Sequence, residues 1–213
     1  MNKSASAKKN FNILDMPTAG MISIVLVVLC VVVGFIKPAF LSQYNLTTLS
    51  RTISFTTMVA FGQTLVLLTG GIDLSVAGVA GMSGILSAWL MVNTSIPWWL
   101  AIILVLALAF ICGSINGILI TKMNMVPFVV TLATGSIFTG IIYVVTKGSP
   151  IMGMPAQATK LGQGILFRIL PYPAIAMIVL ALVGTYMLRY TPFGRYIYAV
   201  GGNQNAASIA GIK

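Results

Sequence analysis

Few side chains in this sequence are able to do acid–base or nucleophilic chemistry. Only two of its 213 residues are acidic, Asp15 and Asp73, and it contains no histidine. Ser83 lies in a Gly-x-Ser-Gly stretch, the arrangement of an intramembrane serine protease. A serine nucleophile needs an adjacent base, usually histidine, to accept its proton. Because that base is missing, we interpret the motif as a chance match and expect no catalytic residue.

The two carboxylates do not form a catalytic pair either. An aspartyl protease needs two carboxylates that share a proton, but Asp15 precedes the first apolar segment and Asp73 follows the second. A proton-driven carrier usually has several buried titratable groups. No G-x-x-x-x-G-K-[ST] loop for nucleotide phosphates occurs. The sequence therefore predicts a passive pathway, not an enzyme, with no cofactor or metal and with its energy supplied by another subunit.

Composition indicates a membrane protein. The chain is 58% hydrophobic and 7% charged, whereas a soluble domain carries roughly 25% charged residues. The formal net charge of +10 does not indicate nucleic-acid binding, because no continuous basic face exists to displace counterions. We expect an all-α, polytopic transmembrane protein whose partners include membrane lipid but no nucleic acid.

Six apolar segments are long enough, or nearly so, to cross a bilayer as helices of about 20 residues. A polar stretch at 146–172 is too long for a tight turn, so we expect an external loop with room for a short surface helix. The expected spans of a transmembrane domain at 19–188 are 19–36, 53–69, 74–92, 98–121, 127–145 and 173–188.

Basic residues indicate the orientation. Positive charge near the N-terminus predicts a cytoplasmic tail at 1–18, and six alternating spans then place 189–213 in the cytoplasm as well. The inside group comprises Lys3, Lys8, Lys9 and Lys122, and the outside group comprises Lys37, Arg51, Lys147, Lys160 and Arg168. Since this tally is mixed, the orientation depends on the bias at the N-terminus and after the sixth span.

A break separates the second and third spans. Gly70 and Gly71 permit irregular backbone, which survives at membrane depth only when it is buried in protein or lines a cavity. Asp73 follows at once, and a carboxylate there faces protein, water or a partner rather than lipid. The sequence predicts a broken or re-entrant element around 69–76, with Gly70, Gly71, Asp73 and Ser75 as its structural residues.

Polar side chains inside two later spans are candidates for a substrate pathway. Asn116 lies within Gly113–Gly117, a GxxxG spacing that lets helices approach closely, and it bonds either to another helix or to a substrate. In the fifth span the candidates are Thr131, Thr134 and Ser136. Their hydroxyls line a polar path or, equally, bond back to carbonyls of their own helix.

The stretch 189–213 is amphipathic and resembles a soluble segment. Gly201-Gly202-Asn203 predicts a turn, and Asn203 or Asn205 is a candidate helix cap. An ordered cytoplasmic segment of this length indicates a docking surface; the alternative is a plain loop before another span.

Two of these stretches together resemble one known family. LLTGGIDLSVAG at 67–78 resembles the GGIDLSVG signature of the permease subunits of ribose-type ATP-binding-cassette importers. GRYIYAVGGN at 194–203, followed by Ala206-Ala207 and Gly211-Ile212, resembles a second segment of that family, and 147–150 matches a short loop pattern. The resemblance covers nearly the whole chain, from about residue 21 to 213. Ala77 departs from the signature, in which glycine is usual.

The resemblance implies a permease that forms the pathway for ribose or a related sugar, such as xylose, arabinose, galactose or an autoinducer-like furanose, across the bacterial inner membrane. It implies a second permease subunit, a cytoplasmic ATP-binding subunit and a periplasmic sugar-binding protein as partners. Family members have about ten spans, so it also implies a chain truncated after six. A stand-alone secondary carrier or channel for a small polar solute is the alternative function.

The resemblance also implies residue roles. Gly70 and Gly71 turn the chain at the membrane boundary, and Asp73 caps the following helix in preference to contacting sugar. The residues implied to couple to the ATP-binding subunit are Gly194, Arg195, Gly201, Gly202 and Asn203.

Overall fold

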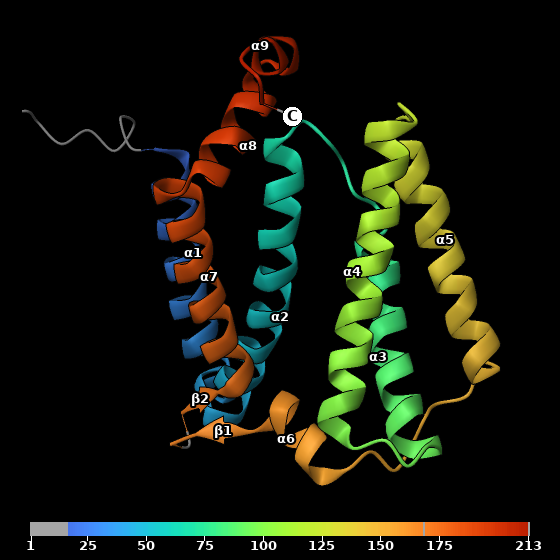
Figure 1. The fold of residues 1–213 in the computed structure, drawn as a ribbon. Helices are drawn as coiled ribbons and strands as arrows, with labels where there is room; N and C mark the ends of the chain where they lie inside the picture. The colour runs from blue at the N-terminus through green and yellow to red at the C-terminus, as the bar shows by residue number, and fades with distance from the viewer. Residues whose placement is uncertain (1–16, 168, 213) are drawn as a thin grey trace, which may run out of the picture. The chain divides into compact units, whose positions relative to one another are not determined.

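The computed structural model describes residues 17–167 and 169–212, and Figure 1 shows its ribbon. Residues 1–16 of the expected cytoplasmic tail, Arg168 of the expected loop, and Lys213 lie outside the described residues. The described residues fall into two compact units, with the boundary between Leu49 and Ser50.

The first unit contains α1 (Thr18–Ile36), a short 3-10 helix η2 (Pro38–Leu41) and the start of α2 (Gln43–Leu68). At 1.5 Å per residue, the 19 residues of α1 extend about 28 Å, close to the hydrocarbon thickness of a bilayer. The Asn45 amide donates a 2.8 Å hydrogen bond to the Phe40 carbonyl, which holds the connection between α1 and α2 in place.

The second unit contains the rest of α2 and all later elements. Helices α3, α4 and α5 contact one another, and they lie side by side in Figure 1. Helix α2 meets α7 where the Phe61 ring fills the space beside Gly184. The elements are α3 (Val76–Asn93), α4 (Trp98–Lys122), α5 (Pro127–Thr146), α6 (Ala156–Gln163), β1 (Ile165–Leu166), β2 (Leu170–Pro171), α7 (Tyr172–Tyr190), α8 (Pro192–Gly202) and α9 (Gln204–Ile209).

Most of the long apolar side chains are exposed, whereas many of the buried residues are small or polar. A cluster of Met82, Cys112 and Phe138 is buried where α3, α4 and α5 meet, while most long aliphatic side chains of α1 are exposed. Among the described residues, the buried polar ones are Thr47, Ser54, Ser75, Asn116 and Thr131. This arrangement suits lipid, where helix association depends on close packing and interhelical hydrogen bonds rather than on hydrophobic burial.

Six helices in the described part of the chain are long and apolar enough to cross a membrane: α1, α2, α3, α4, α5 and α7. The expected number of spans and the all-α class are therefore confirmed, and the two-residue strands β1 and β2 form only a small antiparallel pair.

The expected span bounds agree with the helices to within two residues, except at the start of α2. That helix begins at Gln43, ten residues before the expected 53. The hydroxyls of Thr47 and Ser54 donate to carbonyls four residues earlier, so polar residues continue the helix beyond its apolar part. The 146–172 connection does contain a short helix, α6.

Candidate functional site

The break expected around 69–76 is present between α2 and α3. Helix α2 ends at Leu68, and the amide of Gly71 donates to the Val66 carbonyl at 3.1 Å. Gly70 has a φ of +82°, the left-handed conformation that closes a helix C-terminus at little cost only for glycine. The neighbouring Gly71 avoids a close contact, because a Cβ there would lie 3.2 Å from Cγ1 of Val66.

Asp73 orders the backbone that leads into α3. Its Oδ1 accepts hydrogen bonds from the Ser75 amide at 2.8 Å and from the Ser75 hydroxyl at 2.6 Å. Ser75 is the residue that precedes the first helical residue, Val76. Asp73 thus forms an Asx turn before the helix. The expectation that it caps α3 by accepting from the first N–H groups of the helix is wrong, because it accepts from Ser75, the cap residue, instead.

Asn116 extends this contact across to α4. Its Nδ2 donates to Oγ of Ser75 at 2.9 Å, and only 4% of the residue is exposed. A carboxylate only accepts hydrogen bonds, so the Ser75 hydroxyl proton must point to Asp73 and the Asn116 amide must donate to Ser75. The direction of this chain fixes the amide orientation. It leaves Oδ1 of Asn116 buried with no hydrogen-bond partner among the described residues.

The hydroxyls of the fifth span bond within their own helix. Thr131 donates to the Pro127 carbonyl at 2.8 Å, Thr134 to Val130 at 3.0 Å and Ser136 to Leu132 at 3.0 Å. Thr131 is 2% exposed, and its hydroxyl also lies 3.3 Å from the carbonyl of Ile72 in the break. Because this hydroxyl has a single proton, its shorter bond is to its own helix, and the Ile72 carbonyl is the alternative acceptor in the break.

The break lies at the depth of the spanning helices. Ser75 contacts Asn116, which lies six residues before the last residue of α4, Lys122. At 1.5 Å per residue, α3 begins about 9 Å inward from that helix end. Backbone polar groups at such a depth need protein partners or a water-filled cavity, and Asp73, Ser75 and Thr131 supply partners.

A cavity of about 240 Å³ adjoins the break. Asn116 and Thr131 both line it, together with Asp73. Gly113 and Gly117 line it as well, and nothing lies within 4 Å of a Cβ at either position. This GxxxG spacing therefore makes no close helix contact within the described chain. The other lining residues are Val66, Thr69, Gly71, Ile72, Ile120, Thr121 and Pro127.

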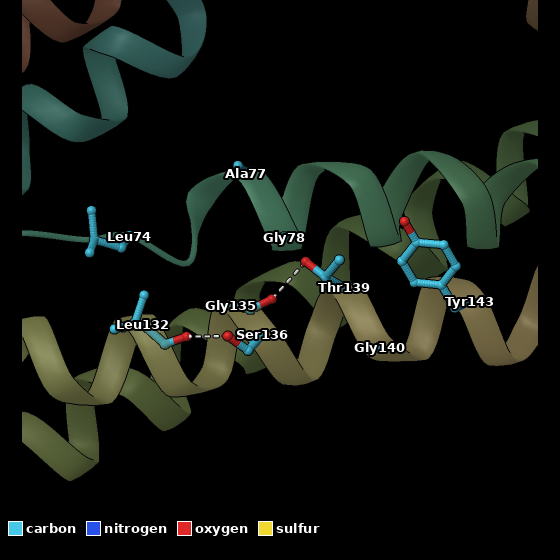
Figure 2. Close-up of a pocket in the computed structure, with 9 residues that line it drawn as sticks. All are labelled: Leu74, Ala77, Gly78, Leu132, Gly135, Ser136, Thr139, Gly140 and Tyr143. Atoms are coloured by element: carbon cyan, nitrogen blue, oxygen red, sulfur yellow. Dashed lines mark hydrogen bonds between the residues drawn. The ribbon is translucent and has the colours of Figure 1, made fainter. Parts of the chain in front are cut away.

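A second, more open groove of about 490 Å³ runs between α3 and α5, and Figure 2 shows it. Ser136 lines it, whereas Thr134 lines neither this groove nor the cavity beside the break. The helices cross closely here, because a Cβ on Gly78 would lie 2.7 Å from the Gly135 carbonyl oxygen. Ala77 lines the groove and is exposed, so the methyl group in place of the usual glycine is accommodated.

The expected coupling residues lie on α8 and at its ends. Thr191 caps α8 by accepting from the Gly194 amide at 3.4 Å, and a Cβ on Gly194 would overlap the Leu188 carbonyl. Gly201 lies against the Leu68 carbonyl at the end of α2. Arg195 is exposed.

The second half of this segment differs in part from the expectation. Gly201 and Gly202 belong to the last turn of α8 rather than to a separate turn. Asn203, one of the two candidate caps, accepts from the Ala206 amide at 2.9 Å and caps α9. The contacts of Gly78 with Gly135 and of Gly201 with Leu68 were not anticipated, because nothing in the sequence indicates which helices meet at a glycine.

Comparison with known proteins identifies the family. The model of the family described as "Branched-chain amino acid transport system / permease component" matches residues 45–213. The ribose import permease protein RbsC of Bacillus subtilis (strain 168) is 43% identical over 190 residues, covering 88% of this chain and 58% of the relative. No solved structure matches.

Two further relatives carry other sugar names. The D-allose transport system permease protein AlsC of Escherichia coli (strain K12) is 30% identical and covers 100% of this chain and 65% of the relative. The galactose/methyl galactoside import permease protein MglC of Salmonella typhimurium (strain LT2) is 32% identical over 99% of this chain and 67% of the relative. The chain thus spans about three fifths to two thirds of the length of these relatives.

The family match agrees with the six spanning helices, and the resemblance expected from the two signature stretches is confirmed. The chain is a multi-pass inner-membrane protein and belongs to the family of branched-chain amino acid transport system permease components.

Proposed function

We propose that the chain is a permease subunit of an ATP-binding-cassette importer and forms the pathway for a ribose-like monosaccharide across the bacterial inner membrane. The observation that carries this proposal is the 43% identity, over 88% of the chain, to a protein named as a ribose import permease. The allose and galactose names of other relatives favour a sugar over the amino acids in the family's description.

The pathway in this proposal involves the residues beside the break. Asn116 and Thr131 line the cavity next to Asp73, and Ser136 lines the groove between α3 and α5. Thr134 lines neither space and donates to the Val130 carbonyl, so we give it a structural role.

The ATP-binding subunit docks on the cytoplasmic α8–α9 segment in this proposal. Helix α8 exposes three aromatic side chains, Phe193, Tyr196 and Tyr198, and it also exposes Arg195. Aromatic and arginine side chains are enriched where protein surfaces bind tightly. Gly194 makes a close contact with α7, and Gly201 makes one with the end of α2. Because these contacts fix α8 to the spanning helices, a displacement of α8 would also displace the break after α2. Gly202 and Asn203 close the helix and start α9.

Uptake measurements test the substrate and the source of energy. The chain is expressed with its cognate ATP-binding and sugar-binding proteins in a bacterium that lacks its own ribose uptake. We expect accumulation of labelled ribose, with weaker or no uptake of allose, galactose and leucine. Uptake of leucine in preference to any sugar would refute the sugar assignment. Uptake that does not need the ATP-binding subunit would support the stand-alone carrier instead.

Charge reversal on α8 tests the docking surface. We expect Arg195→Glu to reduce co-purification of the ATP-binding subunit and to uncouple ATP hydrolysis from transport. Lys160→Glu, an exposed charge on α6, is the matched control and should leave co-purification unchanged. Normal co-purification and normal coupling in the Arg195 variant would place the docking surface elsewhere.

A further inference from the structure

The turn between β1 and β2 presents two large apolar side chains. Phe167 is 86% exposed and Ile169 is 77% exposed, and the Ile169 amide closes the turn by donating to the Leu166 carbonyl at 3.1 Å. Phe167 has a φ of +50°, a left-handed conformation that hairpin turns usually give to glycine or asparagine and that is unfavourable for a bulky side chain. The fold thus holds an aromatic ring in the open where a small residue would cause less strain.

The hairpin is fixed to the start of α7 and to the end of α6. The Tyr172 amide donates to the Gly164 carbonyl at 3.0 Å, and the Gly164 amide donates to the Lys160 carbonyl at 2.7 Å. A Cβ on Gly164 would lie 2.7 Å from Cε2 of Tyr172, so the hairpin packs directly on the first residue of α7. Pro171 between them is fully buried. The depth of the turn therefore follows from the depth of α7.

The length of α7 places the hairpin at the membrane surface. The 19 residues of α7 extend about 28 Å, close to the hydrocarbon thickness of about 30 Å, so Tyr172 lies near the hydrocarbon boundary. The headgroup region adds about 5–8 Å beyond that boundary. Each strand of the hairpin has two residues and extends about 7 Å. The turn is therefore within reach of the headgroup region, at the end of α7 where Figure 1 shows β1 and β2.

The surface next to the hairpin favours lipid as its partner. On α7, the side chains of Val179, Leu182 and Val183 are each more than half exposed, as expected of a helix face that contacts acyl chains. The segment from Ile169 to Pro171, which joins the turn to this helix, is apolar as well. The apolar side chains of the hairpin thus continue the lipid-facing surface of α7.

Helix α6, in the same connection, has the opposite character. Its exposed residues include Gln157, Lys160 and Gln163, which are typical of a surface in water. One connection therefore combines a polar helix with an apolar hairpin, and only the hairpin carries the exposed aromatic ring.

We propose that the β1–β2 hairpin is an interfacial anchor that inserts Phe167 and Ile169 into the boundary between headgroups and acyl chains, in the leaflet where α7 begins. Its partner is the phospholipid bilayer itself, and the contact is additional to the six spanning helices. Interfacial elements bury their apolar side chains about 5–10 Å into this boundary. Arg51 of α2 donates to the Gln163 carbonyl at 3.0 Å, so the anchor also sets the height of α6 beside the start of α2.

Nitroxide labels at single cysteines measure the depth of the turn. In a background without Cys30 and Cys112, separate variants carry the label at Ile169 in the turn, at Gln157 on α6 and at Leu182 on α7. All three positions are exposed. The chain is placed alone in phosphatidylcholine vesicles at a low ratio of protein to lipid. Electron paramagnetic resonance then gives the collision rate of each label with oxygen, which concentrates in lipid, and with a water-soluble nickel chelate.

We expect the label at position 169 to collide more with oxygen than with the chelate, as the label at 182 does. The label at 157 should show the reverse order. The same accessibility to the chelate at 169 as at 157 would place the turn in water and overturn the proposal. Low accessibility to both reagents at 169 would indicate a protein contact, such as a second copy of the chain, and would overturn it as well.

Replacing Phe167 tests the role of the ring without disturbing the turn. Glycine adopts a positive φ freely, so Phe167→Gly should keep the hairpin while removing the ring. We expect collisions of the label at 169 with the chelate to increase by about tenfold, which corresponds to roughly half of the transfer free energy of a fully buried phenylalanine. Phe167→Trp is the matched control and should leave the collision rates unchanged, because tryptophan also suits the interface. Unchanged rates in Phe167→Gly would refute the anchor. The measurement needs no transport, so its outcome is independent of the importer assignment.

Discussion

Replacing Ser75 by alanine should destabilise the protein through two different side chains at once. The change removes the hydroxyl that donates to Asp73 at 2.6 Å and accepts from Asn116 at 2.9 Å. Asn116, which already has an unpaired Oδ1, would then have no hydrogen-bond partner among the described residues for either end of its amide. Interhelical hydrogen bonds in membranes are worth about 0.6 kcal/mol on average and up to about 1.7. A buried polar group left unpaired costs about 1–3 kcal/mol. We therefore expect a loss of about 1–3 kcal/mol for Ser75→Ala.

A double-mutant cycle isolates the contact between the two side chains. Asn116→Leu alone removes the orphaned acceptor as well as the donor, so its cost should be smaller than that of Ser75→Ala. In the double variant the amide is absent when the hydroxyl is lost, and we expect a coupling free energy of about 0.5–2 kcal/mol. The assay is reversible unfolding of the purified chain in detergent micelles, followed by circular dichroism. Strict additivity of the two substitutions would refute the hydrogen-bonded chain from Asp73 to Asn116.

Three further predictions concern the helix contacts and the break. Gly78→Ala should destabilise the protein by about 1–3 kcal/mol, because its Cβ would lie 2.7 Å from the Gly135 carbonyl oxygen. The control is Gly84→Ala on the same helix, whose Cβ meets nothing within 4 Å and which should be neutral or stabilising in the same unfolding assay. Gly194→Ala should reduce sugar-dependent ATP hydrolysis by the complex, since the added methyl overlaps the Leu188 carbonyl. Gly162→Ala on α6, with open space around its Cβ, is the control and should retain this activity; the reverse order would contradict the packing of α8. Asp73→Asn should have a mild effect on the amount of protein in the membrane, because an amide oxygen still accepts from Ser75, whereas Asp73→Leu should lower that amount. Equal loss of transport in both variants, at normal amounts of protein, would assign the role to the charge itself.

The sequence was sufficient for features that depend on local composition. Apolar length located the six spanning helices, and the Gly70-Gly71 pair located the break, because both follow from what a bilayer and a glycine permit. The start of α2 was missed, since the hydroxyls that continue a helix past its apolar part lower its hydropathy without breaking it.

Features that depend on the pairing of distant helices were not predictable. The Gly113–Gly117 spacing is as suitable for a helix contact as any in the chain, yet these glycines line a cavity while Gly78 and Gly135 make the close crossing. Asn116 and Thr131 were candidates by residue type alone. Their contacts with Ser75 and with Ile72 join residues 41 and 59 positions apart, which no local pattern encodes.

The most direct test of the account is the energy source for transport in a reconstituted system. The chain, with its cognate ATP-binding subunit, is placed in liposomes together with ribose-loaded sugar-binding protein. We predict ribose uptake that requires ATP, is blocked by vanadate and is unaffected by proton or sodium ionophores. Uptake that continues without ATP and collapses with an ionophore would contradict the account.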